Sequence, residues 1–312
     1  MNLPPPHGLT VQLGERLDSL ADGLAAMLRE PRDDAFAGDV VCVPGPGVQR
    51  WLAQRLSTRL GAVQGDGVCA GIAFDDVRRV CDRAVAAGAG YDPGDDPWAV
   101  ERLVWAVLRA FEQAAGEPWF APVADHLAGG DAARPGRRYA TAARLAGLFS
   151  RWLQWRPVQL EQWLTRDDRW QARLWRRVCD VVEGPDPFER RRRALRVLAA
   201  EPGLVDLPQT WHIFAPPQVA PGVVETVAAL AAHRSVHVWV AAPGVAVAAD
   251  ARWRHDYPLA SLGEARRRAT AGWLAVARVR DVPSTNAPPR TLLQRLQADV
   301  CGSAGSDLAD LV

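Results

Sequence analysis

Val40-Val41-Cys42-Val43-Pro44-Gly45-Pro46-Gly47-Val48-Gln49-Arg50-Trp51-Leu52 is the stretch that decides the fold of this 312-residue chain. A β-branched run, a Pro/Gly turn and a helical pattern predict the first unit of a parallel α/β sheet. Nucleotide-binding loops begin in the same way, but they need a lysine for the outer phosphates and a hydroxyl for magnesium. Arg50 and Trp51 stand near those two positions. We therefore expect Pro44, Gly45, Pro46 and Gly47 to form a degenerate nucleotide loop, with Trp51 packing the helix onto the sheet as a structural residue.

The composition restricts the chemistry further. All 37 basic residues are arginines, which excludes Schiff-base and P-loop lysine chemistry, and 36 acids leave a net charge of only +1. The net charge therefore does not indicate a nucleic-acid partner, and any surface that binds nucleic acid must be a local patch of positive charge. The five cysteines never form a C-x-x-C pair, and neither they nor the histidines show metal-ligand spacing. With no signal peptide and no apolar run long enough to cross a membrane, we expect a cytoplasmic protein without a metal or a membrane partner.

The order of patterns predicts one α/β core interrupted by helices. Residues 1–74 are expected to begin the core, 75–202 to form a helical insert, and 203–312 to continue the core and end in a cut-off helix at Leu292–Val300. The fold class is therefore α/β with a large all-helical insertion, helix-rich overall. Helices are expected over about 15–29, from Asp96 as N-cap, and over about 138–155, 170–182, 188–200 and 222–232, with strands at 40–43, 210–214 and 235–240.

Arginine beside tryptophan recurs along the predicted helices. The chain has 13 tryptophans, and pairs such as Arg151-Trp152 and Trp155-Arg156 resemble the arginines and stacking rings of single-strand channels. For any one tryptophan, packing in a helical core is the more frequent alternative. The run Arg190–Arg193 is the densest positive patch, and it fits either a phosphate contact, through residues such as Arg190 and Arg192, or a solvated helix face.

A second element that nucleotide binding requires, the acidic strand end that holds magnesium, is also missing from the sequence. The strand that in an ATPase would end in magnesium-binding acids ends as Ile213-Phe214-Ala215-Pro216-Pro217. No other catalytic motif is present, so we expect no catalytic residue in this chain. Two alternatives stay open at this point: an ATPase with a divergent loop that uses Arg50, and a structural scaffold with no DNA contact.

Several blocks together resemble one family. They are Val41–Pro44, Gly47–Leu52, Gly67–Ile72, Leu148-Phe149, Trp155-Arg156-Pro157, Trp163, Trp170–Trp175 and Leu292–Val300. This order is similar to the N-terminal portion of the RecC family, the gamma subunit of exodeoxyribonuclease V, the RecBCD helicase–nuclease.

The resemblance implies a RecA-like pseudo-helicase core of the superfamily 1 type that has lost its ATP-binding motifs. It implies a subunit that splits duplex DNA and guides or scans the 3′-ended strand during double-strand-break repair. The partners would be RecB-like and RecD-like subunits in a heterotrimer, which would hold the ATP and magnesium, together with double- and single-stranded DNA. By the same resemblance, DNA contacts are expected at Arg50, Leu148 and Arg156, whereas the prolines at 44 and 46 replace the polar residues usual in that loop.

Overall fold

The computed structural model describes residues 8–14, 16–30, 37–61, 67–128, 136–182, 184–217, 219–241, 273 and 277–282. Its strands are β1 (Leu9–Gly14), β2 (Asp39–Cys42), β3 (Ile72–Asp75), β4 (Thr210–Phe214), β5 (Ser235–Ala241) and β6 (Arg278–Asp281). Its α-helices are α1 (Leu17–Leu28), α2 (Pro46–Ser57), α3 (Val77–Ala89), α4 (Val100–Gln113), α5 (Ala121–Ala128), α6 (Arg137–Trp155), α7 (Pro157–Trp163), α8 (Trp170–Val181), α9 (Pro187–Ala200) and α10 (Pro221–Leu230). Short 3-10 turns lie at Pro93–Asp95, Pro118–Phe120 and Pro202–Leu204.

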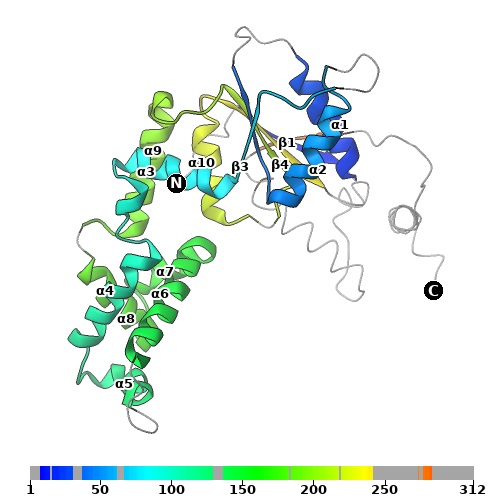
Figure 1. Cartoon of the computed structure of the whole chain (residues 1–312). Helices are drawn as coiled ribbons and strands as arrows, with labels where there is room; N and C mark the ends of the chain where they lie inside the picture. Colours follow the sequence, from blue (N-terminus) through cyan, green and yellow to red (C-terminus); the bar gives the residue numbers. More distant parts are fainter. Residues whose placement is uncertain are drawn as a thin grey trace, which may run out of the picture. The chain divides into compact units, whose positions relative to one another are not determined.

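The chain divides into two compact units (Figure 1). The sheet unit comprises residues 1–81, 205–219 and 223–312, and the helical unit comprises residues 82–204 with 220–222. The expected helix at Leu292–Val300 lies outside the described residues.

The sheet unit is built on a six-stranded parallel sheet in the order β3-β2-β4-β5-β1-β6. The predicted α/β class with a parallel sheet is confirmed. The expectation that the sheet begins at Val40 was wrong, because β1 precedes it and lies between β5 and β6, with Val11 opposite Val238. The strands β1, β3 and β6 were all missed. β1 does carry the alternating signal of a strand, since Leu9, Val11 and Leu13 are apolar and buried, but it follows a proline run that is typical of irregular backbone.

Two helices cover one face of this sheet. Leu20 and Leu24 of α1 and Leu52 and Leu56 of α2 pack in one cluster with Val41, Phe214 and Trp239 of the strands. Asp22 of α1 ties the helices together, because its two carboxylate oxygens accept hydrogen bonds from Arg55 and Arg59 of α2 at 2.8–3.1 Å. Figure 1 shows the two helices side by side against the strands. The position of α2 is thus fixed by the burial of Leu52 and Leu56 and by the hydrogen bonds of Arg55 and Arg59 to Asp22 of α1.

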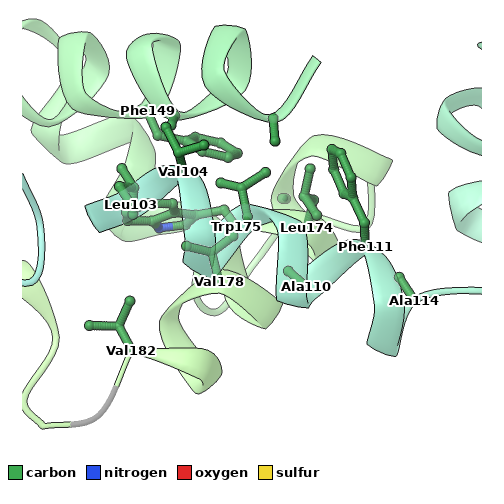
Figure 2. Packing of buried hydrophobic residues seen from close by; sticks show 14 of the residues in the cluster. Leu103, Val104, Ala110, Phe111, Ala114, Phe149, Leu174, Trp175, Val178 and Val182 are labelled. Atoms are coloured by element: carbon green, nitrogen blue, oxygen red, sulfur yellow. The ribbon is translucent and has the colours of Figure 1, made fainter. Parts of the chain in front are cut away.

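The helical unit has its own core, in which α4, α6 and α8 contribute most of the side chains. Trp175 of α8 is fully buried, with ring centroids 5.0 Å from Phe149 of α6 and 5.6 Å from Trp98. Figure 2 shows this tryptophan among Leu103, Val104, Phe149 and Val178. An aromatic centre explains how helices with several arginines each still form a stable body.

Most of the expected helices are confirmed within two residues, namely α1, α6, α8, α9 and α10. The start expected at Asp96 was wrong: α4 begins at Val100, and Asp96 instead accepts the N–H of Trp98 at 2.9 Å in the turn before it. Helices α3, α5 and α7 were not predicted individually. α7 was missed because Pro157 indicated a helix end, whereas it also occupies the first position of the next helix, where its missing N–H costs nothing.

Candidate nucleic-acid interface

The predicted degenerate loop connects β2 to α2 as an open surface turn. β2 ends at Cys42, Gly45 precedes the first helical residue, and Pro46 begins α2. A Cβ added to Gly45 or Gly47 would meet no atom within 4 Å, so close packing does not require either glycine. Pro46 also lacks the N–H that a phosphate would use there. Arg50 is exposed one turn later and makes no ion pair with the described residues. The loop therefore offers one free guanidinium but no phosphate cradle.

Trp51 contacts the sheet as expected, but it is not buried as a core residue would be. Its side chain is 37% exposed, and its ring centroid lies 6.2 Å from that of Phe214 at the end of β4. The exposed fraction of Trp51 was not predictable, because helical periodicity gives the buried face of α2 but not how far the neighbouring strand end extends. Trp51 thus presents aromatic surface beside the loop.

The ends of the neighbouring strands hold no free carboxylate for magnesium. β4 ends at Phe214, and Ala215 follows in the left-handed region at φ 48°, with its N–H donating to the carbonyl of Trp239 at 2.8 Å. At the end of β3, Asp75 accepts the N–H of Asp76, and Asp76 accepts the N–H groups of Arg78 and Arg79 at the start of α3. These acids stabilise backbone turns and the helix N-terminus.

The outward face of α6 is the most distinctive basic surface that the structure describes. Arg144, Leu148, Arg151 and Trp155 recur at spacings of four, three and four residues, so they lie along one side of the helix. Arg144 and Arg151 are exposed, Trp155 is 38% exposed and Leu148 is partly exposed. No acid occurs among the 19 residues of α6, and neither Arg144 nor Arg151 makes an ion pair with a described residue. This row is therefore positive, aromatic and unneutralised.

Arg156 directly follows Trp155, at the break between α6 and α7. Its N–H donates to the carbonyl of Trp152 at 2.8 Å, its own carbonyl accepts the N–H of Leu160 at 3.2 Å, and its side chain is exposed. Pro157 forces the break, because a proline cannot continue the hydrogen-bonding pattern of α6 and disfavours a helical residue before it. The structure thus brings together Leu148 and Arg156, two of the expected contacts, in one helix and its end.

Arg144 and Arg151 were not among the predicted contacts. The signal that would have found them is present in the sequence, namely an acid-free helix whose arginines are seven residues apart. Along the helix axis that spacing is about 10 Å, close to three nucleotides at about 3.4 Å each along one stacked strand.

The arginine run on α9 is divided between several tasks. Arg190 is 16% exposed, donates to Asp96 at 2.5 Å and to the Tyr91 hydroxyl at 3.0 Å, and lies 4.2 Å over the Tyr91 ring. Arg192 pairs with Glu161 of α7 at 2.5 Å. Arg193 is exposed and has no ion pair within the described ranges. DNA contacts by Arg190 and Arg192 stay predictions, and the geometry favours Arg193 as the free cation of this run.

The described part of the chain shows no activated nucleophile or metal cluster. Burial raises the pKa of the Cys69 and Cys179 thiols, which keeps them protonated at neutral pH. Burial and the neighbouring Asp96 carboxylate raise the pKa of Tyr91, so its hydroxyl stays neutral beside Arg190. No group of three or more His, Cys, Asp or Glu residues suited to a metal lies in the described ranges.

Comparison with known proteins gives the family. The family described as RecC, N-terminal domain, matches residues 9–301. The chain belongs to the RecC family. The RecBCD enzyme subunit RecC of Mycolicibacterium smegmatis is 39% identical over 75% of this chain, and that of Mycobacterium tuberculosis is 36% identical over 97% of it. The RecC subunit of Haemophilus influenzae is 19% identical over 73% of the chain.

This RecC-family chain spans only part of those relatives. The matches cover 21%, 30% and 23% of the three relatives, in the same order. The resemblance expected from the Arg-Pro and Trp-rich blocks is thereby confirmed at the level of the family. Of the helices that the structure describes, none combines the length and hydrophobicity that a membrane crossing requires.

Proposed function

We propose that this chain is a non-catalytic, DNA-handling part of a RecBCD-type helicase–nuclease that acts in double-strand-break repair and recombination. The observation that supports the proposal most directly is the α6 row, in which Arg144 and Arg151 make no ion pair with a described residue and lie along the same helix side as the exposed Trp155, with the exposed Arg156 directly after it. Guanidinium groups neutralise phosphates while an indole stacks on a base, and this combination suits a single strand guided along a helix.

The sheet unit fits a pseudo-helicase core of the RecA-like type. A parallel sheet with a glycine turn after β2 has the layout of a nucleotide-binding domain, yet the turn lacks a lysine and a hydroxyl. ATP and magnesium would therefore be bound by RecB-like and RecD-like partners in a cytoplasmic heterotrimer. In this proposal Arg50 contacts DNA beside Trp51 and does not contact a nucleotide.

The salt dependence of DNA binding tests the proposal. We would measure the affinity of the chain, assembled with its partner subunits, for forked DNA across a salt series. Each lost phosphate contact on a single strand flattens the slope of log affinity against log salt by about 0.7. The double variant Arg144→Gln, Arg151→Gln should therefore flatten it by about 1.4, and Arg156→Gln by about half of that.

A matched control uses arginines that are already paired. Arg169 pairs with Asp167 and Arg173 with Asp168, so Arg169→Gln, Arg173→Gln removes the same charge from the same unit but should leave the slope unchanged. Equal slopes for the test and control variants would favour the scaffold alternative. Magnesium-dependent ATP turnover by the purified chain, abolished by Arg50→Ala, would favour the divergent-ATPase alternative.

A further inference from the structure

An exposed aromatic pair on the helical unit is unrelated to the α6 row. Trp105 of α4 is 64% exposed and Tyr139 at the start of α6 is 52% exposed, and their ring centroids are 6.0 Å apart. Neither ring belongs to the buried cluster of this unit. Two large rings that contact each other and still face solvent are costly to leave uncovered, and such pairs are typical of binding surfaces.

The charges around the pair are balanced. Glu112 pairs with Arg138 at 3.5 Å, and Arg102 pairs with Asp95 at 2.7 Å. Two exposed charges of opposite sign, Glu101 and Arg109, make no ion pair with the described residues. On α4 they lie four residues before and four residues after Trp105, so the three side chains share one face, with the charges about 12 Å apart.

This balance separates the surface from a nucleic-acid site. A DNA strand needs several unpaired cations, as on α6, whereas here one free cation faces one free anion across an indole. Trp, Tyr and Arg are the residues most enriched at the energetic centres of protein interfaces. The surface therefore fits a protein whose charges are placed in the opposite order.

We propose that Glu101, Trp105, Arg109 and Tyr139 form a docking surface for another protein subunit of the helicase–nuclease complex. The contacting segment carries a cation opposite Glu101 and a carboxylate opposite Arg109, with an apolar side chain against Trp105 and Tyr139. The identity of the complex rests on the proposed function, but the surface itself is separate from the α6 row.

The test measures assembly and DNA binding with the same variants. The chain is titrated with purified RecB-like and RecD-like subunits, and its DNA affinity is measured separately on assembled complex. Trp105→Ala should weaken assembly about 30-fold, the effect of losing one central aromatic contact. Glu101→Arg and Arg109→Glu should each weaken assembly about tenfold through like-charge contacts, with DNA affinity of the assembled complex unchanged. Because all three side chains are exposed, circular dichroism should show that every variant folds.

Trp155→Ala is the matched aromatic control. It should weaken single-strand binding and leave assembly unchanged, so the two proposals can fail separately. The docking proposal is overturned if Trp105→Ala and Arg109→Glu both assemble as the unchanged chain does, or if the unchanged chain does not bind the partner subunits. Loss of DNA affinity in assembled Trp105→Ala would assign the surface to nucleic acid, and loss of self-association would assign it to a second copy of this chain.

Discussion

Trp175 is predicted to tolerate phenylalanine far better than alanine, for a reason specific to its position. Its ring is fully buried against Phe149 and Trp98, yet its indole Nε1 has no hydrogen-bond partner among the described residues. A buried N–H without a partner costs about 1–3 kcal/mol. Packing of the Trp175 ring therefore stabilises the fold, whereas its buried N–H without a partner destabilises it.

The magnitudes follow from these two contributions. Trp175→Ala removes the ring and leaves a cavity, which costs about 3–5 kcal/mol in the free energy of unfolding. We expect a value near the lower end of that range, because the substitution also removes the buried N–H that has no partner. Trp175→Phe keeps an aromatic ring between the same neighbours and loses about 1–2 kcal/mol of packing. Relief of the unpaired N–H offsets that loss, so the net change should stay within about 1 kcal/mol.

Denaturant unfolding followed by far-ultraviolet circular dichroism measures both variants. Trp163→Phe is the matched control, because Trp163 is buried in the same cluster but its nitrogen is not among the buried atoms without a partner. It should cost about 1–2 kcal/mol with no compensation. If Trp175→Phe proved as destabilising as Trp175→Ala, the indole N–H would be hydrogen-bonded in solution and the reasoning would be refuted.

Two further predictions concern the sheet unit. Trp51→Ala should cost about 2–3 kcal/mol, less than the 3–5 of a full core deletion, because the side chain is already 37% exposed; a loss in the full core range by thermal unfolding would show that Trp51 is covered. Burial lowers the pKa of His237, and the Arg280 guanidinium lowers it further, whereas Glu30 acts in the opposite direction. The ring of His237 lies 5.5 Å from that of His212, between centroids. Because the folded pKa lies below the unfolded value of about 6.5, the stability from neutral His237 is present above that pH and is lost as the pH falls through it. His237→Gln should therefore reduce the drop in denaturant midpoint between about pH 7.5 and 5.5, and an identical drop in both proteins would contradict this.

Strong local signals predicted the fold better than they predicted the site. The long helix α6 and strand β5 were found because their apolar periodicity is unambiguous. β1 was missed, since the prolines that precede it are typical of irregular backbone and concealed its alternating pattern. The arginine run shows the limit for function: successive helical residues point about 100° apart, so only the structure distinguishes the paired Arg190 from the exposed Arg193. Likewise, the row on α6 could be recognised as an exposed surface only once the structure showed which face of that helix is buried.

The position of β1 also determines when the sheet can form. Leu9 pairs with Val236, so the first strand leaves the ribosome 227 residues, from 236 minus 9, before its neighbour exists. At about 5–20 residues per second, that delay is roughly 10–45 s. The helical unit, which comprises residues 82–204 and 220–222, is synthesised entirely within this interval. Nascent chains thus carry the apolar side chains of β1 without their β5 partners during this interval, and chaperone capture of β1 would protect them most during this period.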